Sequence, residues 1–335
     1  MENGNNTVDH VDRSNLRDFD IVMGVWLPGF ICVIGIIGNF FALLVLCYDR
    51  SECPTFLSLR ALATSDLILL TAAMMQQVVP FYCIHAKITN SFCLNQGYFR
   101  VYAWPVVCIA QMASMWLVVL ISSERYIAII HPLKAVRMRN LPRVQSAILV
   151  VFAGAILFNI PKFFEFKPER EFYESLNVTF VIVSDTQLRV NTVYRYLYNT
   201  ALYCLVVYAI PIPILTFLNV RIVRQITAAR KQWDNLNRSQ QKEVKATILP
   251  LCIVLVYFVC STQSLLAFIL DAVFVRRYIW LEIYTAVVNI LVILNSAVNF
   301  ILMYLFGRKF RNLLAEVVGC QRSATNSPIL KHEYV

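Results

Sequence analysis

Seven long apolar stretches constrain this chain more than any other feature. They cover residues 21–47, 57–82, 99–130, 144–164, 196–226, 247–273 and 279–306. A helix needs about 20 apolar residues to cross the hydrocarbon core of a bilayer, and each stretch is long enough. Backbone polar groups inside lipid must be satisfied within the chain, so each stretch is predicted to be helical. The sequence therefore predicts an all-α membrane protein with a seven-transmembrane helix bundle.

The distribution of charge predicts how this bundle is oriented. Only 15% of the residues are charged, whereas a soluble domain carries about 25%. With the N-terminus outside, the inner segments hold a large excess of Lys and Arg, and the outer segments nearly balance, as the positive-inside rule requires. The net charge of +10 then reflects topology and contact with anionic lipid, and no nucleic-acid partner is needed to explain it.

The topology divides the chain into four parts. Residues 1–20 are predicted to be an extracellular tail, 21–306 the seven-span domain, 307–318 a short membrane-surface helix and 319–335 a cytoplasmic tail. The first part is polar and lacks the apolar core of a cleavable signal peptide, so the first span is expected to direct insertion. Sequons at Asn5 and Asn177 fall on the predicted outer side and are candidate glycosylation sites.

Three cysteines stand out among the ten in the chain. Most of the others lie within spans, where cysteine behaves as a small apolar residue. Cys83 and Cys93 share an outer loop, in which an oxidising environment permits a disulfide, and two free thiols are the alternative. Cys320 follows the last amphipathic segment and is a candidate for palmitoylation.

The third span ends in the charged sequence Glu124-Arg125-Tyr126. A fixed charge beside lipid costs about 2.5–3.5 kcal/mol even on a lenient insertion scale. Charges at such a position are therefore expected to be paired, to belong to a switch, or to anchor the helix by reaching for the membrane surface.

Several motifs occur in a fixed order along the spans. They are Gly38-Asn39, Leu62-Ala63 with Asp66, Glu124-Arg125-Tyr126, Pro211, Asn295 with Asn299, and Gly307-Arg308-Lys309-Phe310-Arg311. This order resembles that of rhodopsin-like (class A) G-protein-coupled receptors. The stretches 124–135 (ERYIAIIHPLKA), 159–165 (NIPKFFE) and 294–300 (LNSAVNF) are similar to invertebrate FMRFamide-type neuropeptide receptors.

The resemblance implies a function and a set of partners. A receptor of this family is not an enzyme; it lies in the plasma membrane and activates a heterotrimeric G protein, and arrestin is a further partner. The subfamily implies an amidated, FMRFamide-like neuropeptide as the ligand. The last three residues, Glu333-Tyr334-Val335, offer a segment that a PDZ domain can bind as an added strand.

The family pattern also assigns a switch at the inner membrane surface. It comprises Glu124, Arg125, Tyr126, Glu243, Asn299 and Tyr304. Arg125 keeps its charge under all ordinary conditions and therefore needs an acid or water. Glu243, near the start of span six, is expected to reach across to it. Release of this pair would let span six swing outward, in a two-state equilibrium that the ligand biases.

Asp66 is the one acid deep within a span. An isolated carboxylate in that position would neutralise itself or find partners. The family pattern supplies Asn39, Ser114, Asn295 and Asn299. Two interpretations stay open: a structural polar network, or a site for a sodium ion. No other cofactor or metal site is predicted.

The resemblance disfavours two ligand classes and suggests a third. Val107 stands where amine receptors carry an aspartate, and Ile293 stands where opsins carry the retinal lysine. The candidate peptide-binding residues are Gln76, Gln77, Tyr102, Gln111, Gln263, Asp271, Glu282, Tyr284 and Asn289. Acids of the second outer loop (Glu165, Glu169, Glu171, Glu174 and Asp185) are candidates for a rim that steers a basic peptide, and for each of them alone a solvated surface charge is the alternative.

The chain also departs from the family pattern. Span six reads Cys260-Ser261-Thr262-Gln263, without the usual tryptophan and proline, and span seven has Phe300 and Met303 in place of proline and tyrosine. No cysteine is available to tie the second outer loop to span three, so this loop is predicted to be looser or held by other contacts. A receptor-like protein without efficient signalling is therefore an alternative. A transporter is disfavoured because the chain shows no repeat and a single deep acid.

Overall fold

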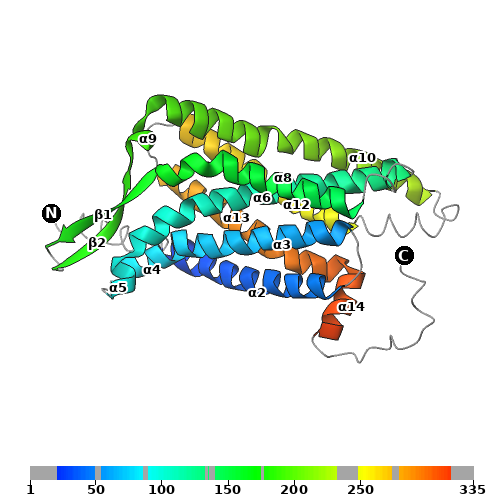
Figure 1. Ribbon diagram of the computed structural model, residues 1–335, viewed down its shortest axis with the longest axis horizontal. Helices are drawn as coiled ribbons and strands as arrows, with labels where there is room; N and C mark the ends of the chain where they lie inside the picture. The colour runs from blue at the N-terminus through cyan, green and yellow to red at the C-terminus, as the bar shows by residue number, and fades with distance from the viewer. Residues whose placement is uncertain are drawn as a thin grey trace, which may run out of the picture.

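The computed structural model describes residues 21–49, 54–85, 90–132, 135, 140–174, 177–231, 248–273 and 279–317. Within these ranges, seven helices are long and apolar enough to cross a membrane, and they lie side by side in one bundle (Figure 1). In order, they are Val22–Tyr48, Pro54–Ile84, Gln96–Ile130, Leu141–Phe164, Tyr194–Ala228, Ile248–Ala267 and Ile279–Phe306. They confirm the predicted fold class and lie within a few residues of the predicted boundaries.

Several spans combine more than one type of helix. Span one is the π-helical segment Val22–Trp26 followed by α2 (Leu27–Tyr48), and span two is α3 (Pro54–Ala73), the π-helical segment Met74–Val78 and α4 (Val79–His85). Span three is α6 (Gln96–Ile130), preceded by α5 (Ser91–Leu94), and span four is α8 (Leu141–Asn159) with the 3-10 turn Ile160–Phe164. Span five has π-helical segments Tyr194–Leu202 and Leu205–Ala209 before α10 (Pro211–Lys231). Spans six and seven are α12 (Ile248–Val273) and α13 (Ile279–Phe306).

A short helix, α14 (Arg308–Val317), follows span seven, as the sequence predicts. Gly307 forms the turn between the two helices. A Cβ at this position would lie 2.5 Å from the carbonyl oxygen of Met303, so the turn leaves no space for a larger residue. Phe310 is buried, and its ring lies 5.9 Å from that of Phe300, which ties α14 to the inner part of span seven.

Span three is the most buried helix of the bundle. In its most apolar stretch 61% of the residues are buried, compared with 22–44% in the other six spans. Met115, Leu117 and Val118 lie at the centre of the main hydrophobic core. Side chains on α6 can therefore contact most of the bundle, which makes this helix the natural carrier of functional residues.

Spans one and seven pack closely because small residues face each other. A Cβ on Gly35 would lie 2.7 Å from the Cβ of Ala297, and one on Gly38 would lie 3.0 Å from the Cβ of Phe300. Phe300 stands where the family pattern has a proline, and α13 runs without interruption from Ile279 to Phe306.

The second outer loop forms a β-hairpin, which the sequence analysis did not predict. Strands β1 (Phe166–Tyr173) and β2 (Val178–Asp185) are antiparallel, with Phe166 opposite Asp185, and the short helix α9 (Gln187–Val190) follows. The hairpin projects from one end of the bundle and α14 lies at the other (Figure 1). We call these the outer and inner ends, after the predicted orientation.

Candidate functional site

At the inner end, Glu124 and Arg125 are both buried, each 4% exposed. Ser58 donates a hydrogen bond of 2.6 Å from Oγ to Oε1 of Glu124. Arg125 donates from Nη2 to Oγ1 of Thr55. Both hydroxyls belong to the start of α3, so these contacts join span three to span two; we call this arrangement the inner clasp. The charged groups reach protein partners instead of the membrane surface, which favours a switch over a simple anchor.

Sequence reasoning did not identify the two hydroxyl partners of the inner clasp. Ser58 lies two helical turns before Asp66 on the same helix, so it shares a face with that acid. A search along the inward face of α3 for hydroxyl residues would have found it. Thr55, one turn earlier, carries the weaker signal because it stands at the first turn of the described helix.

The remaining switch residues occupy different environments. The Tyr126 ring lies 6.4 Å from that of Phe217 and packs with the cluster around Ile222, which connects span three to span five. Glu243 lies outside the described residues. Tyr304 is 47% exposed, whereas Met303 is fully buried. One residue turns a helix by about 100°, so Tyr304 does not take the inward place of the tyrosine in the family pattern.

The deep acid lies at the meeting point of three spans. Asp66 is fully buried. Its Oδ1 accepts a 3.1 Å hydrogen bond from Ser114 Oγ, and its Oδ2 accepts a 2.6 Å hydrogen bond from Asn299 Nδ2. Asn39 donates to the carbonyl oxygens of Gly35 and Ser296, at 2.9 Å and 3.0 Å, and so joins span one to span seven nearby. The structure therefore brings most of the predicted network together.

The chemistry around Asp66 is compatible with both a structural polar network and a site for a sodium ion. The carboxylate and the Ser114 hydroxyl are oxygen ligands, which hard cations prefer. Among the described residues, no group of three or more His, Cys, Asp or Glu gathers as a metal site. A sodium ion near Asp66 therefore stays a prediction beside the purely structural network.

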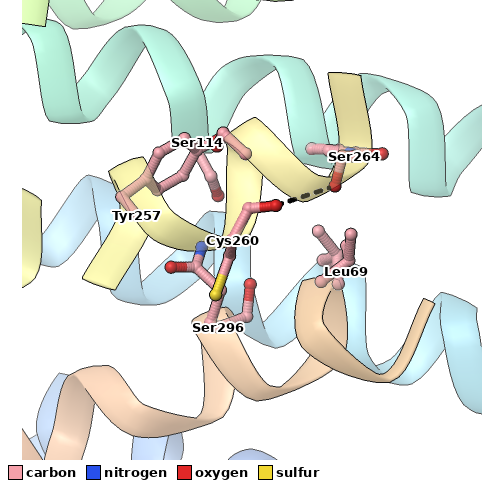
Figure 2. Close-up of a pocket in the computed structure, with 10 residues that line it drawn as sticks. Leu69, Ser114, Tyr257, Cys260, Ser264 and Ser296 are labelled. Atoms are coloured by element: carbon pink, nitrogen blue, oxygen red, sulfur yellow. Dashed lines mark hydrogen bonds between the residues drawn. The ribbon is translucent and has the colours of Figure 1, made fainter. Parts of the chain in front are cut away.

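A polar cavity adjoins the network on its outer side. Figure 2 shows its labelled side chains converging from α3, α6, α12 and α13, with Ser264 Oγ donating to the Cys260 carbonyl oxygen at 3.1 Å. The complete lining is Leu69, Gln111, Ser114, Tyr257, Cys260, Ser261, Ser264, Val292, Asn295 and Ser296. The cavity thus borders Gln111 on one side and Ser114, the partner of Asp66, on the other. The small side chain of Ser261 stands here in place of an indole.

Two pairs of the predicted ligand-binding residues bridge neighbouring spans. Gln111 donates from Nε2 to the Tyr208 hydroxyl at 3.3 Å, which joins spans three and five. Tyr284 donates from its hydroxyl to Oε1 of Gln263 at 3.0 Å, which joins spans six and seven. Tyr208 was not predicted, because its partner lies 97 residues away and no motif marks it.

The other ligand-binding candidates are dispersed. Gln76 and Gln77 are partly buried in a π-helical segment of span two, and Asn289 and Glu282 are exposed on α13. Asp271 belongs to the last turn of α12, and its side chain lies outside the described part.

Tyr102 does not lie with Gln111. It is 58% exposed and lines an apolar surface groove between spans two and three, together with Met75, Phe99 and Val106. Gln111 follows nine residues later on the same helix, which places it about 180° around the axis. Tyr102 is therefore expected to face the lipid, which argues against its place in the peptide pocket.

Glu165 is not a rim acid, contrary to the sequence analysis. It is fully buried and receives four polar contacts, from Lys162, Arg189, Tyr194 and Trp104. The hairpin has one face that carries Val181 of β2, which is buried. Glu169 and Glu171 of β1 point to the other face, because Arg170 between them is the residue paired with Val181. These two acids therefore face away from the bundle.

The covalent features fall at the outer end. Cys83 and Cys93 form a disulfide with an S–S distance of 2.03 Å, which joins the end of α4 to α5. Asn177, a candidate glycosylation site, is exposed in the hairpin turn and has a φ of 51°. Asn5 and Cys320 lie outside the described residues.

The comparison with known proteins agrees with the seven-helix fold. The sequence model of the family "7 transmembrane receptor (rhodopsin family)" matches residues 38–302 of the chain. The chain belongs to this family.

Three relatives indicate the part of the family to which the chain is similar. An FMRFamide receptor of Drosophila melanogaster is 28% identical over 93% of this chain. The FMRFamide peptide receptor frpr-18 of Caenorhabditis elegans is 27% identical over 87% of this chain and 68% of its own length. Neuromedin-U receptor 2 of Mus musculus is 28% identical over 86% of this chain and 73% of its own length. The chain spans 56% of the length of the Drosophila receptor.

Proposed function

We propose that this chain is a plasma-membrane receptor for an amidated, FMRFamide-like neuropeptide, with its N-terminus outside, and that it activates a heterotrimeric G protein. The observation that carries the proposal is the inner clasp. A buried arginine held by hydroxyls of a neighbouring span can be released when the spans move. Two relatives named as FMRFamide receptors support the ligand class.

The polar contacts of the bundle suggest how a ligand signal crosses it. A peptide between the Gln111–Tyr208 and Gln263–Tyr284 pairs changes the spacing of the spans that they bridge. The cavity of Figure 2 connects Gln111 to Ser114 and hence to Asp66. The side chains that line this cavity can transmit a rearrangement from one span to the next by shifting against one another. At the inner end, release of Arg125 from span two then frees the surface for the G protein.

The proposed ligand chemistry requires an acid near the outer ends of the spans. An Arg-Phe-amide terminus needs a carboxylate for its guanidinium group and an aromatic slot for its ring. Glu165 is already engaged by two cations, so it is a poor partner. We assign this role to Glu282 or Asp271, near the outer ends of α13 and α12.

The proposal is tested by applying a library of amidated peptides to cells that express the chain, with calcium and cAMP readouts. We expect a peptide ending in Arg-Phe-amide to signal. The Arg125→Gln variant should keep peptide binding at matched surface expression and lose the signal. Equal signalling by Arg125→Gln and the unchanged chain would contradict the proposed switch. Silence toward all peptides, with a response to another ligand class, would contradict the ligand.

A second function is favoured by one specific observation. The side chains at positions 261, 300 and 303 differ from the family pattern, and the exposed Tyr304 does not replace the missing inward tyrosine. A receptor-like protein that binds a ligand or a partner receptor without efficient signalling is consistent with this. Peptide-stimulated nucleotide exchange on purified G proteins distinguishes the two functions. Arrestin and a PDZ protein stay proposed partners of the inner end and the tail.

A further inference from the structure

We propose that Glu165 fastens the β1–β2 hairpin to the outer ends of spans three, four and five, in the role that a cystine has in the family pattern. It does so through two ion pairs, of which that with Lys162 is fully buried, and through hydrogen bonds from spans three and five. The inference concerns the hairpin alone and does not depend on the identity of the ligand. We call Glu165 and its four polar partners the outer pin.

Two cations neutralise the carboxylate. Lys162 Nζ lies 2.9 Å from Oε1, and the two side chains are 2% and 0% exposed. Arg189 Nη1 lies 3.5 Å from Oε2 and is 30% exposed. A buried carboxylate without such partners would be strongly unfavourable. The two cations therefore offset the cost of burying the carboxylate.

Neutral groups complete the shell around the ion pair. Tyr194 donates from its hydroxyl to Oε1 at 3.0 Å, and Trp104 donates from Nε1 to Oε2 at 3.2 Å. Lys162 also lies over the rings of Tyr203 and Tyr198, at 5.0 Å and 5.6 Å from their centroids. Such cation–π contacts stabilise a charge that is removed from water.

The partners of Glu165 come from separate parts of the chain. Trp104 belongs to span three, Lys162 to the end of span four, Tyr194 to the start of span five and Arg189 to α9 beyond the hairpin. One carboxylate therefore fixes the relative positions of three spans and the base of the loop. Trp104 lies seven residues before Gln111, which is two helical turns on the same face. The outer pin thus lies directly above the polar contacts to which the peptide is proposed to bind.

The hairpin is seated on span three by a close backbone contact. A Cβ at Gly97 would lie 2.2 Å from the carbonyl oxygen of Val181, and Val181 is 3% exposed. At the base of the hairpin, Thr186 donates from its backbone N–H to the carbonyl oxygen of Glu165 at 3.1 Å. The backbone of Glu165 therefore closes the hairpin while its side chain fastens it to the bundle.

A matched control lies on the hairpin itself. Lys167 and Glu169 form a second lysine–glutamate pair at 2.5 Å, but their side chains are 53% and 46% exposed. The hydrogen bond from Lys167 lowers the pKa of Glu169, as in an ordinary surface pair. Exposed pairs contribute little to stability, whereas a buried pair that loses one partner leaves an uncompensated charge. The two glutamates therefore separate the effect of burial from that of charge.

The test uses Val181→Cys as a reporter in the full chain on intact cells, labelled by a membrane-impermeant maleimide. In this background the reporter should be protected, because position 181 is buried. Adding Glu165→Gln should accelerate labelling by at least about tenfold, the equivalent of about 1.4 kcal/mol. Arg189→Gln should give a smaller increase, and Glu169→Gln none. The double variant Lys162→Met with Glu165→Gln removes both buried charges and should restore much of the protection.

Two results would overturn the inference. One is labelling of the Glu165→Gln chain at the rate of the reporter alone, and the other is equal acceleration by Glu165→Gln and Glu169→Gln. If Glu165→Gln does not reach the cell surface, the comparison between Arg189→Gln and Glu169→Gln decides the matter. Equal rates in that pair would reject the outer pin.

Discussion

Two buried carboxylates in this bundle are stabilised in different ways. Glu165 at the outer end and Asp66 in the middle are both fully removed from solvent. Glu165 is neutralised by Lys162 and Arg189. Asp66 accepts hydrogen bonds from Ser114 and Asn299, which are neutral.

We expect this difference to separate a fixed contact from one that can rearrange. An acid with two cations beside it is held by strong, charge-assisted contacts, so we expect it to keep its neighbours in a fixed arrangement. Asp66 is held by hydrogen bonds from neutral donors, which a bound cation could rearrange. We therefore expect the contacts of Asp66 to change more readily than those of Glu165. Four substitutions test this contrast, from the largest expected effect on stability to the smallest.

Glu165→Gln should have the largest effect. It leaves Lys162 buried beside a neutral amide, and removal of one partner of a buried ion pair costs about 3–5 kcal/mol. The thermal unfolding temperature of the purified receptor should fall accordingly. In a double-mutant cycle, Lys162→Met combined with Glu165→Gln should recover most of this loss. If the decreases in unfolding temperature caused by Lys162→Met and Glu165→Gln simply add in the double variant, the two residues do not stabilise the receptor as a pair.

Gly97→Ala should rank second. The new methyl group would lie 2.2 Å from the Val181 carbonyl oxygen, so the hairpin must move. Overpacking of this kind costs about 1–3 kcal/mol. Hydrogen exchange should increase in β1 and β2 and stay unchanged around Asp66. Gly154→Ala is the control, since a Cβ there meets nothing within 4 Å. Equal destabilisation by the two changes would contradict the close seating of the hairpin.

Ser58→Ala should rank third. It removes the 2.6 Å hydrogen bond to Glu124 and so weakens the inner clasp. Loss of a hydrogen bond to a buried acceptor costs about 1–2 kcal/mol. Because the clasp holds spans two and three together, ligand-free nucleotide exchange on the G protein should increase. An unchanged basal rate would show that this contact does not restrain the receptor.

Asp66→Asn should have the smallest effect on stability and a large effect on signalling. Asparagine has nearly the same shape, and the Asn299 amide can turn over to preserve a hydrogen bond, so the change in stability should be under about 1 kcal/mol. Peptide-stimulated nucleotide exchange should be lost, because the neutral side chain can no longer attract a cation. Full signalling by Asp66→Asn would show that the charge of Asp66 is not needed for signalling, and the proposed difference in role between Asp66 and Glu165 would be wrong.

The bundle was predictable from the sequence because length and hydropathy alone decide membrane insertion. Asp66, Ser114 and Asn299 were also predictable, since the family motif fixes their places on three helices. Glu165 was misread because a glutamate in an outer loop is normally exposed. Its burial depends on Trp104 and Tyr194, which lie 61 and 29 residues away. The hairpin likewise depends on its contact with span three, which no local pattern encodes.

The uninterrupted helix α13 has a mechanical consequence. A proline at position 300 would remove a backbone hydrogen bond and create a flexible point within span seven. Phe300 restores that bond, and its ring packs on Phe310 of α14. Span seven is therefore expected to move as one stiff unit, and within the described inner part the chain changes direction at the Gly307 turn. A displacement at its outer end should reach the inner membrane surface as a tilt of the entire rod.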